Sequence, residues 1–583
     1  MDILTVFKGF KNPLMLKSFA QKKFSSIPHL IEIILLAALF LFTWQWIANH
    51  AGGPLFYDEL LYMNTAVNRI ADPTIINRYF HIYLFLPFLE IWANPLEAVR
   101  YFWAFLAAAT GVFVYTGARL MSRSIIPGLV ALLLYFSQDE IFRYPGVAWS
   151  DFTVMLLVTA AAAVYLLIIR SSKHQAQLTS LLGMLLYLAF RSKETSLPFA
   201  ILLIGFIFIE ESGFLVKPFL KRLVWAVAGA AAGLILMTLL DYIVLGDILF
   251  SLRLNNIREH MQFNLVSGVE QIGYNYFLMI SDKLEMFNTF LLFAVSAVIL
   301  RNTQTRYEKT LYLIPLATIS FLVASLLRGP GIIESRYLIP VLPLLCILAA
   351  QVFRVCIGEK PGKIILSAVL YLAGLFFLYH SAEVIITISQ KYDIYKWNEA
   401  NYYFSFLHPI ALCVLLGIIL FFKRLNAFAV AGMLLCLTVI TYPSLNYNVT
   451  NIKNMWSAGE TNRRLYPFLV FSDQLKYSPD MKMGISSGLP GTDPSIPRFG
   501  MLDANETAIS WMYNICFRQN SHPEQFVRNE YDDLLVDLDQ YKYLILSSAE
   551  WLSLSPETTS AVQQGYNIYR DNDGIAVLLS AQQ

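Results

Sequence analysis

The sequence predicts an all-α polytopic membrane protein that ends in a smaller α/β domain. Of its 583 residues, 57% are hydrophobic and only 14% are charged, and the apolar residues form long blocks separated by short polar connections. Soluble domains carry about a quarter charged residues, so this composition is typical of a protein that crosses a bilayer many times. The net charge of +2 is too small to indicate a nucleic-acid partner.

The apolar blocks predict about 13 transmembrane helices, because a span needs roughly 20 predominantly apolar residues. A further apolar run, residues 80–92, is too short to span and is predicted to be interfacial or re-entrant. The predicted spans lie near residues 28–49, 98–119, 125–137, 151–170, 178–190, 196–210, 222–246, 284–300, 310–327, 337–356, 363–388, 406–422 and 426–443.

Connections rich in lysine and arginine alternate along the chain with connections that are not. Because basic connections lie mostly on the cytoplasmic side, this alternation assigns the two sides of the membrane. Residues 1–27 are basic and are predicted to be cytoplasmic, and every second connection after them is basic as well. This pattern makes residues 28–443 a transmembrane domain with a first outer loop at 50–97. It also predicts that residues 444–583 lie outside the cytoplasm, and polar outer-side residues with this orientation suit a plasma (inner) membrane.

The C-terminal region differs from the rest because it is polar and interrupted by glycine and proline. Residues 543–547 are typical of a buried strand. Residues 566–570 and 575–579 are typical of a hairpin closed by an Asp-Gly turn. About 140 residues suffice for one small α/β domain. Cys516 is the only cysteine in this region, so no internal disulfide is expected.

Polar residues at the helix ends gather on the predicted outer side. Cations there suit a phosphate-bearing ligand, and carboxylates beside them suit acid/base chemistry. Charged groups at a membrane boundary are costly to desolvate, so they usually face a functional cavity. The candidates are Asp58, Glu59, Tyr62, Arg78, His81, Asp151, Lys193, Glu194, Arg258, Arg336 and Tyr337.

Several short motifs occur in a fixed order on this side. They are Asp58-Glu59, His81-Ile-Tyr-Leu, Pro145-Gly-Val-Ala-Trp-Ser-Asp151, Phe190-Arg-Ser-Lys-Glu-Thr195, Gly246-Asp247 and Ser335-Arg-Tyr-Leu-Ile-Pro340. In this order the chain resembles a C-type (GT-C) glycosyltransferase of the protein O-mannosyltransferase and lipid A aminoarabinose transferase superfamily. The resemblance covers residues 28–360. It departs from the family at His81-Ile-Tyr, where two prolines are usual.

The resemblance implies a glycosyltransferase that takes a sugar from a polyprenyl-phosphate donor and passes it to an acceptor outside the cytoplasm. Asp58 is the candidate base, or the group that orients an acceptor already ionised, and Glu59 is its catalytic neighbour. The donor phosphate and lipid are assigned to Arg336, Tyr337, Arg78, His81, Lys193 and Arg258. The acceptor or sugar pocket is assigned to Asp151, Tyr62 and Glu194.

Most of these candidates also have a simpler interpretation. The Asp58-Glu59 pair and Asp151 would serve as helix N-caps, and Lys193 with Glu194 would form a local ion pair. The remaining simpler interpretations are an interfacial histidine for His81, an anchor for Arg336, an aromatic-belt residue for Tyr337 and a lipid-headgroup contact for Arg258.

Two other functions also use lipid or lipid-linked substrates in a membrane. A secondary transporter or lipid flippase would show internal repeats, and none is found. An O-antigen ligase or polymerase would carry a large outer loop in mid-chain, whereas the large polar region of this chain lies at its C-terminal end. No nucleotide-binding glycine motif and no Cys/His zinc spacing is present in the sequence. No cofactor is predicted, and a divalent cation is compatible with the carboxylates but not indicated. Membrane lipids are the other expected partners.

Overall fold

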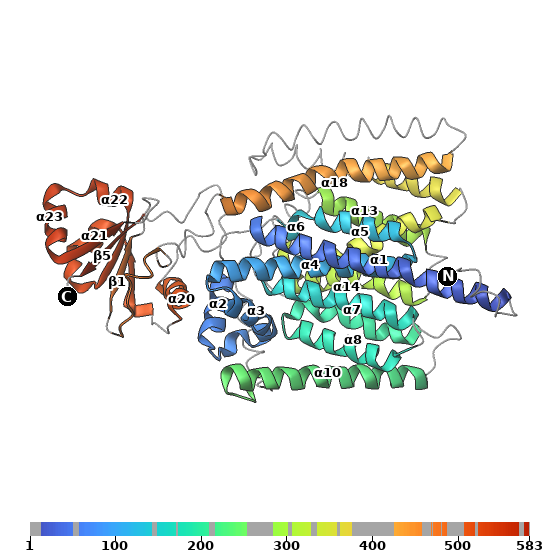
Figure 1. Ribbon diagram of the computed structural model, residues 1–583, viewed down its shortest axis with the longest axis horizontal. Helices are drawn as coiled ribbons and strands as arrows, with labels where there is room; N and C mark the ends of the chain where they lie inside the picture. Colours follow the sequence, from blue (N-terminus) through green and yellow to red (C-terminus); the bar gives the residue numbers. More distant parts are fainter. Residues whose placement is uncertain are drawn as a thin grey trace, which may run out of the picture.

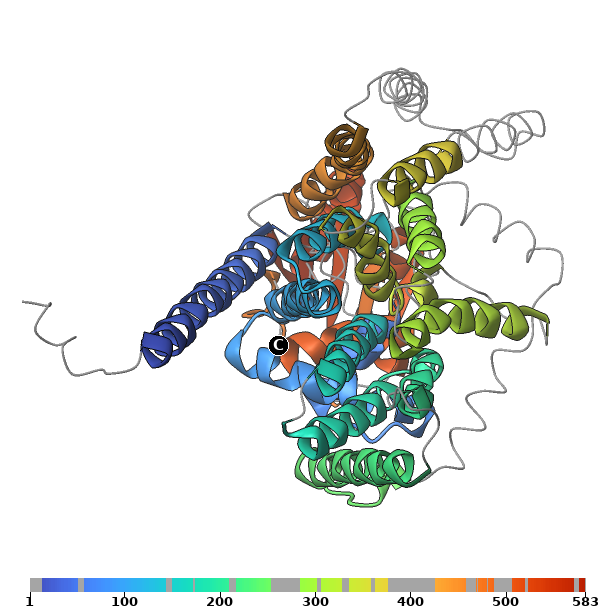
Figure 2. The same ribbon diagram turned by 90° about the vertical axis from the view of Figure 1, so that its right-hand side faces the viewer.

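The computed structural model has a body of long helices with a small sheet domain at one end (Figure 1). Most of the helices are viewed end-on in Figure 2, with the sheet domain behind them. The structure describes residues 13–50, 57–142, 149–170, 173–208, 216–252, 284–300, 306–327, 335–357, 362–375, 425–457, 468, 470–479, 481–486, 506–518, 523–570 and 576–581.

The first half of the helical body contains long helices joined by short ones. Its elements are α1 (Pro13–His50), α2 (Tyr57–Asn68), the 3-10 helix η2 (Pro73–Arg78), α3 (Tyr79–Ile91), α4 (Pro95–Ser122), α5 (Ile125–Phe136), α6 (Asp139–Phe142), α7 (Ser150–Arg170) and α8 (Gln175–Phe190).

The second half is more broken. Its elements are η3 (Glu194–Ala200), α9 (Ile201–Ile204), η4 (Gly205–Phe208), α10 (Val216–Leu245), η5 (Phe250–Leu252), α13 (Leu284–Ile299), α14 (Arg306–Leu327), η6 (Ser335–Leu338), α15 (Leu342–Ala349), η7 (Ala350–Ile357), a helix at Gly362–Leu375 and α18 (Leu425–Ser457).

Five of the described helices are long and apolar enough to cross a membrane, which makes the chain a multi-pass membrane protein. They are Ile31–His50, Pro95–Ser122, Ser150–Arg170, Val216–Leu245 and Val430–Lys453. The run at residues 80–92 forms most of α3, a helix of 13 residues. This length is shorter than a membrane span needs, in agreement with the prediction that the run is not a span. The total of 13 spans stays a prediction, because the span at 406–422 and the end of the one at 363–388 fall outside the described residues.

Three predicted spans differ from the observed elements. Residues 196–210 and 337–356 are not continuous α-helices, because Pro198 and Pro340 lack the N–H that helical hydrogen bonding needs. The chain there alternates between 3-10 and α-helical turns. The last span, predicted to end at residue 443, continues to Ser457 as part of α18.

Glycines allow α8 and α10 to pack backbone against backbone. A Cβ added at Gly229 would lie 1.7 Å from the carbonyl oxygen of Ser180, and one at Gly183 would lie 1.9 Å from that of Ala226. Gly229 and Gly233 have the spacing of a GxxxG helix-packing motif. This close pair closes one side of the helical body.

The C-terminal domain is built on a five-stranded sheet in the order β2-β1-β3-β5-β4. Its first three strands in this order are parallel, and β5 and β4 are added antiparallel. The expected buried strand is β3, and the expected hairpin is β4 with β5. The strands are β1 (Met483–Ser486), β2 (Phe526–Asn529), β3 (Tyr543–Ser547), β4 (Tyr566–Arg570) and β5 (Ala576–Ala581), and the helices are α20 (Glu506–Phe517), α21 (Tyr531–Val536), α22 (Ser548–Ser553) and α23 (Pro556–Gly565).

The C-terminal domain contacts residues 50–97, the segment predicted to be the first outer loop, through α20. This helix packs against α2, the helix that carries Asp58 and Glu59 (Figure 1). Just after α20, Nη2 of Arg518 donates a hydrogen bond to the backbone oxygen of Leu89 in α3, at 3.2 Å. The expectation that the tail lies near the Asp58 loop is therefore confirmed.

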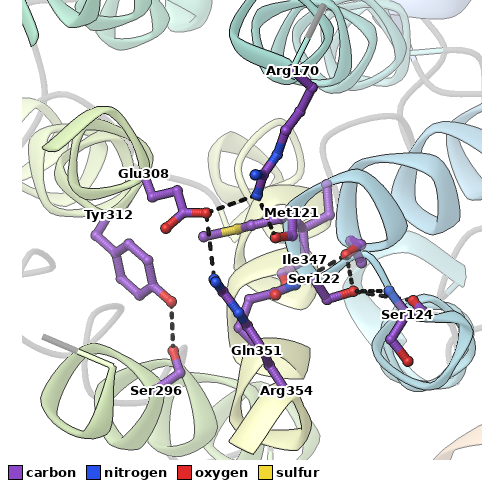
Figure 3. A network of polar contacts seen from close by, with 11 residues as sticks. Met121, Ser122, Ser124, Arg170, Ser296, Glu308, Tyr312, Ile347, Gln351 and Arg354 are labelled. Atoms are coloured by element: carbon purple, nitrogen blue, oxygen red, sulfur yellow. Dashed lines mark hydrogen bonds and ion pairs between the residues drawn. The ribbon is translucent and has the colours of Figure 1, made fainter. Parts of the chain in front are cut away.

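A buried ion-pair network connects the C-terminal end of α7, at Arg170, to neighbouring helices (Figure 3). The carboxylate of Glu308, fully buried, lies 3.2 Å from Nη2 of Arg170 and 3.4 Å from Nη1 of Arg354. Arg170 also donates to the backbone oxygen of Met121. These contacts join α4, α7, α14 and η7 at the end of the helical body that lies far from Asp151.

Candidate active site

A buried ion pair marks the end of α7 that faces the first outer loop. Nζ of Lys193 donates a hydrogen bond to Oδ2 of Asp151 at 2.7 Å, and the two side chains are 8% and 1% exposed. Asp151 lies in the first turn of α7, where the helix dipole favours a negative charge. Its other oxygen, Oδ1, is buried and has no hydrogen-bond partner among the described residues. The pair therefore leaves one carboxylate oxygen able to accept another hydrogen bond.

Further cations lie close enough to affect Lys193. Burial lowers the pKa of Lys193, and although Asp151 opposes this, the charges of Arg336 and Arg78 add to the lowering. Lys193 thus belongs to a cluster of three cations drawn from the first outer loop, the α8–η3 connection and η6.

A second ion pair fastens the first outer loop to the start of η3. Nη1 and Nη2 of Arg78 donate to the two carboxylate oxygens of Glu194, at 2.7 and 3.2 Å. Burial would raise the pKa of Glu194, but the charge and hydrogen bonds of Arg78 offset this and hold the pKa at about 2. Burial lowers the pKa of Arg78, but its surroundings, with Glu194 as the largest contributor, more than offset that effect and raise it. Both groups are therefore ionised at neutral pH.

Aromatic rings hold the remaining cations of the cluster. The guanidinium carbon of Arg336 lies 4.9 Å from the ring centre of Trp149 and 5.8 Å from that of Tyr337. The ammonium of Lys193 lies 4.6 Å from the same Tyr337 ring. Arg336 and Tyr337 are partly exposed, whereas Arg78 and Lys193 are buried. Arg336 and Tyr337 are therefore more accessible from outside the cluster than Arg78 and Lys193.

His81 links the outer loop to α7. Its Nδ1 lies 2.8 Å from Oγ1 of Thr153 in a hydrogen bond, and its ring packs edge-on against Tyr62 at 5.5 Å. His81 is 1% exposed, so it is a buried histidine with a hydrogen-bond partner. Tyr62 on α2, His81 on α3 and Thr153 on α7 form a continuous path between the acidic helix and Asp151.

The acidic pair lies in the first turn of α2. Glu59 is fully buried. Asp58 is placed by its backbone only, because its side chain is outside the described part of the structure. Asp58 and Tyr62 are four residues apart on α2 and so share one face of the helix. That face is the one whose tyrosine contacts His81.

The neighbouring residues Lys193 and Glu194 have different ion-pair partners. The simpler interpretation of Lys193 and Glu194 as a local ion pair is wrong, because each is paired with a different residue. The backbone at Lys193 is extended, with φ −172° and ψ 144°, so the two neighbouring side chains point in different directions. Arg258 lies outside the described residues.

Sequence reasoning missed a second polar connection between the outer loop and the helices. The hydroxyl of Tyr83 in α3 donates to Oδ1 of Asp241 in α10 at 2.6 Å, and Asp241 is fully buried. Nearby, Nη2 of Arg191 donates to the backbone oxygen of Ile76. An acidic residue inside an apolar helix is a signal that could have identified Asp241. Thr153 and Trp149 carried no comparable signal.

Among the described residues, no group of three or more histidine, cysteine, aspartate or glutamate side chains is arranged to hold a metal ion.

Comparisons with known proteins place the fold. No protein-family model matches the sequence, and no curated protein matches it. The apo structure of ArnT from Cupriavidus metallidurans is similar over 95% of this chain and 98% of that chain, with a TM-score of 0.50 and 14% sequence identity. ArnT bound to undecaprenyl phosphate matches over 94% and 97%, with a TM-score of 0.47 and 14% identity. The apo oligosaccharyltransferase of Archaeoglobus fulgidus matches over 94% and 74%, with a TM-score of 0.42 and 12% identity.

At such low identity, the likeness to apo ArnT concerns the fold alone. ArnT is a GT-C glycosyltransferase, so the predicted architecture, a helical membrane domain followed by a C-terminal α/β domain, is confirmed as a GT-C fold.

Proposed function

We propose that this protein is an integral-membrane glycosyltransferase that transfers a sugar from a polyprenyl-phosphate donor to an acceptor outside the cytoplasm. One observation carries the proposal. Three cations, Arg78, Lys193 and Arg336, converge with the carboxylates of Asp151 and Glu194 at the end of α7 that lies next to the acidic helix α2. Such a cluster combines a place for a phosphate with groups that bind hydroxyls.

The donor phosphate is assigned to Arg336, Tyr337 and Lys193. Arg336 is partly exposed, and its guanidinium offers the fork of N–H donors that suits phosphate oxygens. The hydroxyl of Tyr337 would add a neutral donor. Arg78 and His81 connect the first outer loop to η3 and α7, so we assign to them the positioning of that loop. Arg258 stays a candidate phosphate ligand on sequence grounds.

The sugar or acceptor is assigned to the space beside Asp151. Its buried Oδ1 has no hydrogen-bond partner among the described residues, and an unpaired buried acceptor of this kind is costly unless a ligand supplies a donor. A sugar hydroxyl supplies one. Tyr62 and Glu194 border the same cluster and complete this assignment.

The chemistry needs a leaving group and a base. In the proposed step, the acceptor oxygen forms a bond to the anomeric carbon while the bond from that carbon to the phosphate oxygen breaks. The phosphate leaves with the electron pair, and the cations stabilise its charge, so no strong acid is needed. Asp58 takes the acceptor proton, with Glu59 beside it in α2. Where the acceptor is an ionised phosphate, Asp58 orients it instead.

Binding of undecaprenyl phosphate to the purified protein in detergent tests the phosphate site. Arg336→Ala is expected to weaken binding roughly ten- to a hundredfold, since a hydrogen bond to a charged group contributes about 1.5–3 kcal/mol. Arg336→Lys is expected to weaken it less, because lysine keeps the charge but loses the fork. Arg100→Lys is the control, because Arg100 is a buried arginine of α4 that approaches Glu97 instead. Unchanged affinity in Arg336→Ala would move the phosphate site elsewhere.

A transporter or flippase would bind the same lipid but move it without breaking its sugar–phosphate bond. An O-antigen ligase or polymerase would act on a sugar linked to the lipid through a diphosphate, and would release a polyprenyl diphosphate from that donor. Product analysis after parallel incubations with a lipid-monophosphate sugar and a lipid-diphosphate sugar therefore separates all three.

A further inference from the structure

The segment at the start of α7 contacts both cations that face the proposed phosphate site. Trp149 lies under the guanidinium of Arg336, at 4.9 Å from ring centre to guanidinium carbon. Two residues later, Asp151 holds the ammonium of Lys193 at 2.7 Å. One short stretch of chain thus fixes two cations by two different interactions, a ring face and a carboxylate.

The ring of Tyr337 lies against the same two cations. It is 4.6 Å from the ammonium of Lys193 and 5.8 Å from the guanidinium of Arg336. The four groups therefore run in the order Trp149, Arg336, Tyr337 and Lys193, with rings and cations alternating. Because neighbouring cations repel each other, an aromatic face next to each one lowers the cost of holding them together.

Trp149 is itself held in place. It is 7% exposed, and its ring stacks on Phe152 with centres 6.4 Å apart and an interplanar angle of 11°. The backbone N–H of Phe152 also donates to the carbonyl oxygen of Trp149. A buried, stacked ring has few rotamers, so the face it offers to Arg336 is fixed before any ligand binds.

We propose that Trp149 is a positioning residue for donor binding, which holds Arg336 in the orientation that its guanidinium fork needs to grip a phosphate. This inference rests on the proposed function, because it assumes that Arg336 binds the donor phosphate. A long arginine side chain loses much conformational freedom when it binds a ligand, and a preformed ring contact removes part of that cost.

The test is undecaprenyl phosphate binding by Trp149→Phe and Trp149→Leu. Phenylalanine keeps a weaker ring face and leucine keeps none, so affinity should fall about two- to threefold in the first variant and roughly tenfold in the second. The control is Trp103→Leu. Trp103 is fully buried and packs edge-on against the same Phe152 at 5.9 Å, so its replacement makes a comparable packing defect away from the cations.

A double-mutant cycle then shows whether Trp149 acts through Arg336. In an Arg336→Ala background, Trp149→Leu should cause no further loss of affinity, whereas a general packing defect would add its usual effect. If Trp149→Leu weakens binding no more than Trp103→Leu, or if its effect persists without Arg336, the inference is overturned. If the wild-type protein does not bind undecaprenyl phosphate at all, the proposed function itself fails, so the two failures are distinct.

Discussion

The ion pair between Arg78 and Glu194 is expected to be a main fastening of the first outer loop. Arg78 ends η2 and Glu194 begins η3, and the pair is mostly buried, with side chains 7% and 26% exposed. Glu194→Gln keeps the shape of the side chain but removes its charge. The variant leaves a buried guanidinium facing a neutral amide, so the folded state should lose stability.

The magnitude follows from the pKa of Glu194, which falls from an ordinary 4.5 to about 2. Each tenfold change in acidity corresponds to about 1.4 kcal/mol, so the charged form is stabilised by roughly 3 kcal/mol. Removing one member of a buried ion pair typically costs about 3–5 kcal/mol, which agrees with this figure. We therefore expect Glu194→Gln to lower the free energy of unfolding by about 3 kcal/mol at pH 7.

The pH dependence gives the prediction its sign. Because the folded pKa lies below the unfolded one, the stabilisation is fully present above about pH 4.5 and is lost as the pH falls toward 2. The difference in stability between the wild type and Glu194→Gln should therefore shrink as the pH is lowered from 7 to 3. Unfolding in mixed detergent micelles, followed by tryptophan fluorescence, measures it at each pH.

The matched control is Glu97→Gln. Glu97 approaches Arg100 at 3.6 Å but is 43% exposed, and exposed pairs contribute about 0–1 kcal/mol. A loss in Glu194→Gln no larger than in Glu97→Gln, or a difference that stays constant in acid, would refute the reasoning.

Two further predictions concern packing and topology. Gly229→Val should lower the free energy of unfolding by more than about 1–3 kcal/mol, because the new side chain would overlap the backbone of α8. Gly362→Ala is the control and should be neutral, because nothing lies within 4 Å of the added Cβ. Equal melting temperatures for the two variants would contradict the close α8–α10 contact. Val536→Cys, at a position 82% exposed in the C-terminal domain, should react with a membrane-impermeant maleimide on intact cells in a Cys516→Ser background. Lys173→Cys, in a basic connection, should react only after permeabilisation, and the reverse pattern would show that the sides are inverted.

The helical body was predictable where span length and charge alternation decide it. The runs that became α4, α7 and α10 are apolar and long, and the hairpin of β4 and β5 follows from its alternating pattern and turn. The breaks at Pro198 and Pro340 could have been expected from proline chemistry, but apolar runs hide them.

The pairing of side chains within the site was not predictable in the same way. Lys193 and Glu194 bind partners 42 and 116 residues away, and the choice depends on how the extended backbone at Lys193 directs each side chain. Tyr83 and Asp241 are 158 residues apart. Contacts of such range depend on the packing of whole helices, which no local pattern encodes.

Transfer of sugar from a radiolabelled undecaprenyl-phosphate sugar tests the central proposal most directly, with wild-type protein and Asp58→Asn compared in the same membranes of origin, which supply the acceptor. The account predicts that the wild type moves label from lipid to acceptor and that Asp58→Asn is slower by roughly two to four orders of magnitude, as expected for loss of a general base. Undecaprenyl phosphate binding should be kept in the variant, since Asp58 is not assigned to the phosphate. Near-wild-type transfer by Asp58→Asn would remove Asp58 from the chemistry. Binding of the lipid without any transfer by the wild type would contradict the proposed enzyme altogether.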